Sequence, residues 1–289
     1  MPPDRWLELT VVSTEDPTLV SAALLELGAD SVQESGNALI TYLPPPRQPE
    51  EFLTHVRRTL DGLWPSISVE LSWRWQAHEE WEILWRRGLG VRKISPRLLV
   101  VPSWETADPD PGEIPIFIDP GMAFGTAEHA TTRGCLRQLD KRVAPGARMA
   151  DVGAGSGILS IAAALLGAEA VTALELDPLS CETALENLAK NGVGNQVRVI
   201  PARVEGGSLL PGSPFHGIVA NLQIHLLLPL FSTFRASLSP GGWLIVSGVL
   251  DGQQVEILPE VARQEFVLVE EDQEEEWWTG VFELGHRGD

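Results

Sequence analysis

A glycine-rich loop with the sequence DVGAGSG spans Asp151–Gly157. It follows a short apolar run and precedes a helical pattern that starts at Ile158, so we expect it at a strand-to-helix turn. Glycines at such a turn allow positive φ angles and let the backbone approach a ligand closely. The loop therefore predicts a nucleotide site at Gly153 and Gly155. A dinucleotide fingerprint, G-x-G-x-x-G, would instead place its third glycine where this chain has Ile158.

Two polar residues end predicted strands that belong to the same sheet. Glu175 ends the strand after the loop, about 20 residues beyond the glycines, where an acid can accept hydrogen bonds from ribose hydroxyls. Asn221 follows a later apolar strand, at the edge where the donor and acceptor of a transferred group would meet. The alternative interpretations are a solvated acid at a strand end for Glu175 and a turn former for Asn221. Asp177, directly before Pro178, is explained by helix capping alone.

A second glycine-punctuated loop lies upstream, in the segment IDPGMAFGTAEHATTRGCL. It contains Phe124 between Gly121 and Gly125, and it leads to Thr131 and Thr132 near an expected helix start. An aromatic ring and small hydroxyl residues beside a nucleotide site are suited to cover the nucleotide or to exclude water. The segment predicts a lid, and its residues alone leave open which threonine contacts the ligand.

The first part of the chain predicts a small α+β domain. Its periodicity indicates the order β-α-β-β-α-β, which is typical of a ferredoxin-like sandwich. The expected elements are strand Trp6–Val12, helix Pro17–Leu27, strand Ser31–Glu34, strand Ala38–Leu43, helix Glu50–Leu63 and strand Ser66–Trp75. A helix with Trp81, Leu84 and Trp85 on one face, followed by strand Leu98–Val101, is expected to connect this domain to the next.

From Met149 onward, strands and helices alternate, which predicts a doubly wound, mostly parallel, seven-stranded α/β sheet with helices on both faces. The expected strands are Met149–Val152, Ala170–Leu176, Val197–Pro201, Gly217–Ala220, Trp243–Ser247, Phe266–Glu270 and Trp277–Phe282. The expected helices are one from Ile158, Pro178–Lys190, Ile224–Leu238 and Gln253–Arg263. The predicted boundaries are 1–75 for the small domain, 76–104 for the connection and 105–289 for the α/β domain.

Composition argues against several classes of protein. The formal net charge of −19 disfavours binding to a phosphate backbone, and it suits either solubility or a basic partner. The six histidines and two cysteines do not stand at the spacings of a metal site or a disulfide framework. The first residues, MPPDRWLELT, lack the apolar run of a signal peptide, and no apolar stretch is long enough to cross a bilayer. We expect a cytoplasmic monomer without a metal, a membrane segment or a nucleic-acid partner.

These motifs, in this order, resemble those of the bacterial ribosomal protein L-eleven methyltransferase family over most of the chain. The resemblance is carried by EEWEILW with LLVVPSWE, by DPGMAFGTAEHATT, by DVGAGSGILSIAAALLGA with LELDP and NLAKNGV, and by VANL and SGVL. DPGMAFGT followed by HATT is the most specific of these segments. The D-x-G-x-G-x-G loop by itself resembles the cofactor loop of class I S-adenosylmethionine methyltransferases. The chain departs from the family at Ala127, where glycine is usual, and at Glu175, where aspartate is common.

The resemblance implies an S-adenosylmethionine-dependent enzyme that methylates amino groups of that ribosomal protein, on lysine side chains and on the N-terminal amine. It also implies that the N-terminal domain binds this basic substrate. Asn221 is expected to orient the acceptor amine. The cofactor contacts that the resemblance implies fall on Thr132, Gly153, Glu175 and Asn221, with Phe124 and Gly125 in the covering loop. Gly155 is added as a cofactor contact from the glycine loop itself.

Other functions stay open from the sequence. The same pocket would serve a methyltransferase that acts on another protein's lysines or on a small molecule. A non-catalytic, cofactor-binding or ribosome-associated module would keep the fold without the reaction. A pyridine-nucleotide oxidoreductase is disfavoured by Ile158 and by the lack of an evident group for hydride transfer. The acidic run Glu265–Glu276 is interpreted either as a solvated edge strand or as a surface for a lysine-rich partner.

Overall fold

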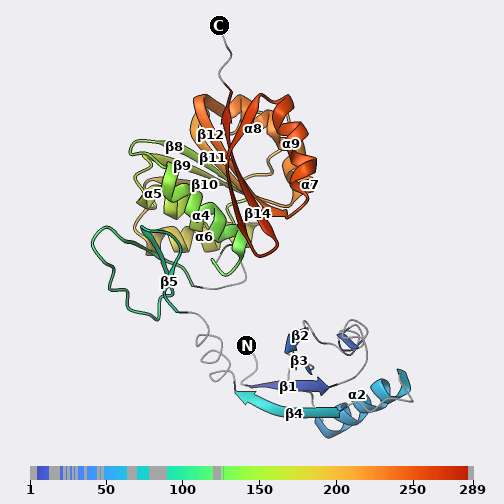
Figure 1. Cartoon of the computed structure of the whole chain (residues 1–289). Helices are drawn as coiled ribbons and strands as arrows, with labels where there is room; N and C mark the ends of the chain where they lie inside the picture. Colours follow the sequence, from blue (N-terminus) through green and yellow to red (C-terminus); the bar gives the residue numbers. More distant parts are fainter. Residues whose placement is uncertain are drawn as a thin grey trace. The chain divides into compact units, whose positions relative to one another are not determined.

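The structure is a computed structural model of the 289-residue chain. Contacts between residues divide the chain into two units, Met1–Leu89 and Gly90–Asp289, each described by itself (Figure 1). The residues that the structure describes are 5–12, 20, 21, 24, 27, 29, 32–35, 38–43, 46, 49–63, 70–77, 90–119, 125 and 127–285. The connecting helix expected around Trp81 lies outside these residues, as does most of the helix expected at Pro17–Leu27.

The first unit contains a four-stranded antiparallel sheet with the strand order β2-β3-β1-β4. Its elements are β1 (Arg5–Val12), β2 (Val32–Ser35), β3 (Ala38–Leu43), α2 (Pro49–Leu63) and β4 (Glu70–Ala77). Leu7, Leu9 and Val11 alternate along β1 and share a buried core with Val56 and Leu60 of α2. This strand order is that of a ferredoxin-like sandwich, so the predicted α+β domain is confirmed in its sheet.

The second unit is built on a seven-stranded sheet with the order β10-β9-β8-β11-β12-β14-β13 (Figure 1). Neighbouring strands are parallel except for β14, which runs antiparallel to β12 and to β13. The strands are β8 (Arg148–Val152), β9 (Ala170–Glu175), β10 (Val197–Pro201), β11 (Phe215–Asn221), β12 (Leu238–Leu250), β13 (Phe266–Glu274) and β14 (Trp277–Leu284). The predicted mostly parallel sheet is confirmed. The strand order reverses between β8 and β11, which is where ligands bind in sheets of this kind.

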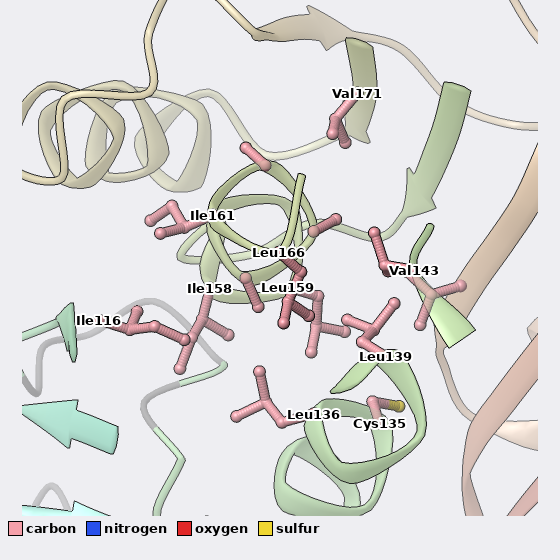
Figure 2. Packing of buried hydrophobic residues seen from close by; sticks show 14 of the residues in the cluster. Ile116, Cys135, Leu136, Leu139, Val143, Ile158, Leu159, Ile161, Leu166 and Val171 are labelled. Carbon is pink, nitrogen blue, oxygen red and sulfur yellow. The ribbon is translucent and has the colours of Figure 1, made fainter. Parts of the chain in front are cut away.

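Helices pack on both faces of this sheet and bury a separate apolar cluster on each. The helices are α4 (Ala130–Arg142), α5 (Ile158–Leu165) and α6 (Pro178–Lys190) in one cluster, and α7 (Ile224–Leu227), α8 (Phe231–Ser237) and α9 (Gln254–Arg263) in the other. Met149 joins the first cluster and its neighbour Ala150 the second, because successive side chains of a strand point to opposite faces. Figure 2 shows Leu136 of α4 beside Ile158 and Leu159 of α5. None of the helices in the described ranges has the length and apolarity needed to cross a membrane.

A three-stranded sheet with the order β5-β6-β7 precedes α4 in the second unit. Its strands are β5 (Arg92–Lys93), β6 (Leu98–Val101) and β7 (Ile114–Phe117), of which β5 and β7 were not expected. All residues of β6 are buried, and Ile116 of β7 belongs to the cluster around α5 (Figure 2). β6, which was expected in the connection between the domains, therefore packs as part of the second unit.

One predicted helix is wrong. The segment expected as a single helix, Ile224–Leu238, is divided into α7, the 3₁₀ helix η1 (Leu228–Leu230) and α8. Pro229 lies in η1, and proline both lacks the N–H for a helical hydrogen bond and crowds the preceding turn. Leu238, the expected last residue of the helix, already belongs to β12.

Candidate active site

The glycine-rich loop turns from the end of β8 into α5, with three of its glycines at positive φ. The φ angle is 78° at Gly153, 53° at Gly155 and 81° at Gly157. A Cβ atom at Gly153 would lie 2.4 Å from Cδ2 of Leu222, so a larger residue has no room there. The Gly153 N–H donates to the Leu174 carbonyl at 2.8 Å, which ties the loop to β9. The tight turn predicted from the sequence is confirmed.

Glu175 ends β9, and its carboxylate joins this strand to the glycine loop. Oε2 accepts a hydrogen bond from the Gly155 N–H at 2.8 Å. Oε1 accepts from the N–H groups of Leu176 at 2.8 Å and Asp177 at 2.9 Å. Three backbone donors therefore hold the carboxylate in one orientation, at the position predicted for a ribose-binding acid. Asp177 caps α6 by accepting from two backbone N–H groups, as expected.

Asn221 ends β11 and is held by the first turn of α4. Its Nδ2 donates to Oγ1 of Thr131 at 3.1 Å and to Oγ1 of Thr132 at 3.4 Å. Both threonine side chains are buried, at 1% and 0% exposure. Because the amide nitrogen has only two hydrogens, both are used, and the amide oxygen Oδ1 is left as the acceptor.

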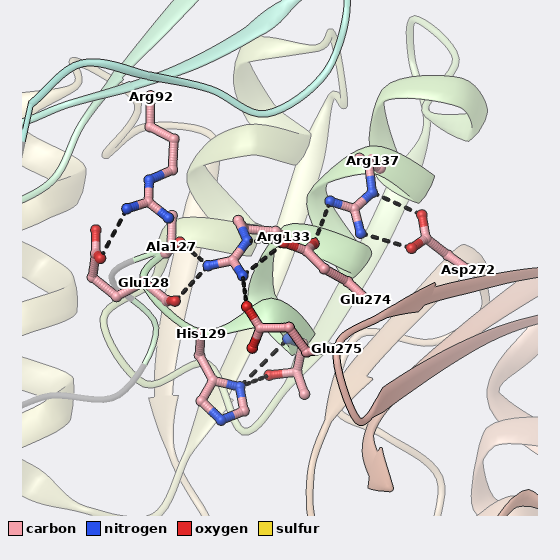
Figure 3. A network of polar contacts seen from close by, with 10 residues as sticks. Arg92, Ala127, Glu128, His129, Arg133, Arg137, Asp272, Glu274 and Glu275 are labelled. Carbon is pink, nitrogen blue, oxygen red and sulfur yellow. Dashed lines mark hydrogen bonds and ion pairs between the residues drawn. The ribbon is translucent and has the colours of Figure 1, made fainter. Parts of the chain in front are cut away.

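His129 extends this hydrogen-bonded chain. It is the N-cap of α4, and its Nδ1 lies 3.4 Å from the Thr131 backbone nitrogen and 2.7 Å from Thr131 Oγ1 (Figure 3). Since Thr131 Oγ1 accepts a hydrogen bond from the Asn221 amide, the Thr131 hydroxyl can donate its own hydrogen to His129 Nδ1. Burial and the charge of Arg133 lower the pKa of His129. These contacts indicate a neutral imidazole with its proton on Nε2.

A single pocket of about 830 Å³ brings the ends of these strands together. Of the predicted residues, Gly153, Gly155, Glu175 and Asn221 line it, and Thr132 does not. Thr131, the other threonine that the sequence left open, does line it. Other lining residues were not predicted, among them His129, Leu222, Gln223, His225, Trp277 and the segment Ala202–Gly206. His129 stood in the quoted segment HATT, where a residue directly before a helix is a candidate cap. No local pattern pointed to Trp277, which reaches the pocket from the far end of the chain.

The upstream loop touches the glycine loop at one described residue. Gly125 has φ 97°, and its carbonyl accepts a hydrogen bond from Ser156 Oγ. A Cβ atom at Gly125 would lie 3.0 Å from Ser156 Oγ. Gly125 is therefore joined to the glycine loop although it does not line the pocket. Phe124, the aromatic residue predicted to cover the ligand, lies outside the described residues.

Asp151 is a buried acid in β8, next to the last residue of the strand. Its side chain is 1% exposed, Oδ2 accepts from Ser160 Oγ at 2.7 Å, and Oδ1 has no hydrogen-bond partner among the described residues. Burial, reinforced by the negative charge of Glu175, raises the pKa of Asp151 to about 7. Within the same described ranges, no cluster of His, Cys, Asp and Glu is arranged to hold a metal ion.

The acidic run Glu265–Glu276 forms most of β13 and the tip of the β13–β14 hairpin, and its inner face is paired with α4. Arg133 donates to Glu274 at 2.7 Å and to the carbonyls of Ala127 and Glu128 (Figure 3). The other ion pairs of this face are Arg137 with Asp272 and Glu274, and Lys141 and Arg142 with Glu270. β13 is an edge strand, as one interpretation expected, but these carboxylates already have basic partners within the chain. The run is therefore an internal contact of the fold on this side.

Comparison with known proteins identifies the family of this chain. The family described as Ribosomal protein L11 methyltransferase (PrmA) matches residues 8–284. The chain belongs to this family. A relative from Pelotomaculum thermopropionicum, named ribosomal protein L11 methyltransferase, is 33% identical over 94% of this chain and 97% of its own. One of the same name from Symbiobacterium thermophilum is 38% identical over 73% of this chain and 67% of its own. The crystal structure of a ribosomal protein L11 methylase from Lactobacillus delbrueckii subsp. bulgaricus has a TM-score of 0.62 and 32% identity, covering 68% of this chain and all of that one.

Membership of the L11 methyltransferase family makes the chain an S-adenosylmethionine-dependent methyltransferase. Its pocket fits this cofactor, because Gly153 and Gly155 line it with backbone alone and Glu175 presents a fixed carboxylate beside them. Asn221 stands at the same pocket on a neighbouring part of the sheet. The family thus explains why these three strand ends converge.

Proposed function

We propose that this chain uses S-adenosylmethionine to methylate amino groups of ribosomal protein L11, on lysine side chains and on the N-terminal amine. The observation that carries the proposal is Asn221, which lies in the same pocket as Glu175 and keeps its amide oxygen as an acceptor. The names of the relatives from Symbiobacterium and Pelotomaculum support this substrate.

The cofactor contacts are assigned to residues that differ in how directly they act. Bound S-adenosylmethionine supplies an electrophilic methyl group on a sulfonium. The fixed carboxylate of Glu175 accepts hydrogen bonds from the ribose hydroxyls, and Gly153 and Gly155 let the backbone approach the ligand. Thr132 does not line the pocket, so it acts by holding the Asn221 amide. Phe124 and Gly125 remain assigned to a covering loop.

The acceptor must present a neutral amine, and the pocket favours that form. Lysine has a reference pKa of about 10.4, which falls when the ammonium loses its hydration. Oδ1 of Asn221 accepts one N–H of the amine and so orients its lone pair toward the methyl group. An in-line displacement depends on this alignment and on exclusion of water more than on a strong base. His129 is not assigned as a base, because its Nδ1 already accepts a hydrogen bond from the Thr131 hydroxyl.

The two ends of the chain are assigned different tasks. Residues 1–75 recognise the protein substrate and 105–289 carry out the transfer. The connection assigned to 76–104 includes β6, which packs with the second unit. A formal net charge of −19 favours encounter with a basic ribosomal protein and disfavours contact with nucleic acid. A monomer in the cytoplasm would meet that substrate where ribosomal proteins are made.

The test is to incubate the purified chain with isotopically labelled S-adenosylmethionine and recombinant ribosomal protein L11, and to map the methylated amines by mass spectrometry. We expect label on lysines or on the N-terminal amine, and at least about tenfold slower labelling with the Asn221→Ala variant at the same concentration. Absence of transfer, with cofactor binding still detected by calorimetry, would refute this substrate and direct the search to other proteins or small amines. Absence of cofactor binding would refute the assigned cofactor contacts as well.

A further inference from the structure

Trp277 is the large aromatic side chain among the described residues that line the pocket. It is the first residue of β14, directly after the tip of the β13–β14 hairpin. The centroid of its ring lies 4.6 Å from that of His129, in an edge-to-face arrangement with an interplanar angle of 62°. His129 is hydrogen-bonded to Thr131, and Thr131 to Asn221. The same chain of contacts therefore sets the positions of the tryptophan ring and of the amide that receives the amine.

The chemistry of repeated methylation gives this ring a task that Asn221 cannot perform. Asn221 Oδ1 can hold the acceptor nitrogen only through an N–H group, and each transfer replaces one N–H with N–CH₃. The acceptor of a third transfer, a neutral dimethylamine, has no N–H left, and the dimethylammonium from which it forms carries a positive charge. The face of a tryptophan attracts such a cation without needing a donor hydrogen, and it does so most strongly where water is excluded.

Two carboxylates directly before Trp277 in the sequence have the sign that suits a cation. Glu275 and Glu276 form the hairpin tip that precedes Trp277. Both carboxylates act to raise the pKa of His129, against the larger opposite effect of burial and Arg133. Glu275 is 3.6 Å from Arg133 and its side chain is 63% exposed, which leaves most of its charge facing solvent.

We propose that Trp277 is a specificity-determining residue that holds the partly methylated ammonium group in the pocket, so that further methyl groups are added to the same nitrogen. In each transfer the nitrogen lone pair forms the N–C bond while the S–C bond breaks and its electron pair stays on sulfur. The product ammonium then loses a proton to water before the next transfer. This role deepens the proposed function and rests on it.

The first experiment compares Trp277→Leu and Trp277→Phe with the wild-type chain, using the recombinant ribosomal protein and following mono-, di- and trimethylated products over time by mass spectrometry. For the leucine variant we expect the ratio of the later transfer rates to the first to fall about tenfold, with the phenylalanine variant close to wild type. A purely structural role would lower all transfers together, so an unchanged ratio would overturn the proposal. No transfer by the wild-type chain would refute the proposed function and this role with it.

A second measurement does not depend on the product pattern. Choline and 3,3-dimethylbutan-1-ol have the same shape, but only choline carries a charge on its trimethylated centre. Choline should inhibit the first transfer by the wild-type chain at a concentration about five to ten times lower than the alcohol. This difference should disappear in Trp277→Leu, whose folding is verified by calorimetric binding of the cofactor. Equal inhibition of the wild-type chain by the two compounds would contradict a cation-binding role.

Discussion

Replacing Glu175 with glutamine tests the cofactor site with a minimal change of shape. The two carboxylate oxygens accept from different donors, Oε2 from Gly155 and Oε1 from Leu176 and Asp177. A glutamine has one acceptor oxygen, and keeping it at the Oε1 position preserves two of these three bonds. Its amide NH₂ then faces the Gly155 N–H, so the apex of the glycine loop loses its anchor to β9.

The size of the effect follows from these contacts. A hydrogen bond to a charged group contributes about 1.5–3 kcal/mol, so the loss of one such bond to a ribose hydroxyl weakens binding about tenfold to 150-fold. The unpaired Gly155 N–H adds a cost, because the loop must be reordered when the ligand binds. For Glu175→Gln we therefore expect the dissociation constant for S-adenosylmethionine to rise about a hundredfold, with the free energy of unfolding lower by about 1–2 kcal/mol.

Isothermal titration calorimetry with S-adenosylmethionine measures this directly. The matched control is Glu182→Gln, which removes the same charge from an exposed position on α6. The control should bind the cofactor like the wild-type chain. If Glu175→Gln also binds within about threefold of wild type, the assignment of its carboxylate to the ribose is wrong. If both variants lose affinity equally, net charge and not the fixed carboxylate is responsible.

Three further substitutions test other parts of the site. Asn221→Ala should lower turnover at least about tenfold but the free energy of unfolding by only about 1 kcal/mol, as measured by steady-state kinetics and urea unfolding. Unchanged turnover would contradict its assignment to the amine. The pKa of Asp151 is higher in the folded chain, at about 7, than in the unfolded chain, so its ionisation makes wild-type stability fall as pH rises from about 4 through 7. The Asp151→Asn variant lacks this dependence. Its free energy of unfolding, relative to that of the wild-type chain, should therefore rise by about 2 kcal/mol between about pH 5 and about pH 8, in addition to any difference that does not depend on pH. Arg133→Lys keeps the charge near Glu274 but cannot also donate to the two carbonyls, so it should lower the free energy of unfolding by about 1–3 kcal/mol. The loss should exceed that of Arg137→Lys, because the Arg137 side chain is the more exposed. Equal losses in the two variants would argue against the carbonyl contacts.

The elements that the sequence predicted best are those with local signals at both ends. Helix Pro178–Lys190 and strand Val197–Pro201 have the predicted bounds in the structure. The helix starts after a capping aspartate and a proline at its first position, which are strong local signals. The prediction of one helix at Ile224–Leu238 was wrong for a local reason too. Pro229 marked the break, but the prediction gave more weight to the hydrophobic periodicity of the segment. The glycine loop and Glu175 were predictable because their chemistry depends on spacing within one βαβ unit.

The acceptor end of the pocket could not be predicted in the same way. Trp277 reaches His129 only because β14 inserts between β12 and β13, and that strand order is a property of the whole sheet. The pairing of Asn221 with Thr131 and Thr132 likewise depends on how α4 packs on the sheet. Hydrophobic periodicity reports which face of an element is buried, and it does not report which partner covers that face.

The acidic run shows why composition alone misleads about partners. One interpretation of this run was a surface for a lysine-rich partner, yet Glu270, Asp272 and Glu274 are paired with basic residues of α4. Those ion pairs also connect the hairpin that carries Trp277 to the helix that carries Thr131. These ion pairs therefore help to hold the acceptor end of the pocket in shape.

The location of the pocket constrains what the N-terminal unit contributes. Every described residue that lines the pocket, from His129 to Trp277, belongs to the unit Gly90–Asp289. The contacts that fix Glu175, Asn221 and His129 also come from that unit alone. Among the described residues, then, none of the ferredoxin-like sheet lines the pocket. The task proposed for that sheet is therefore to bind the protein whose amine enters beside Asn221.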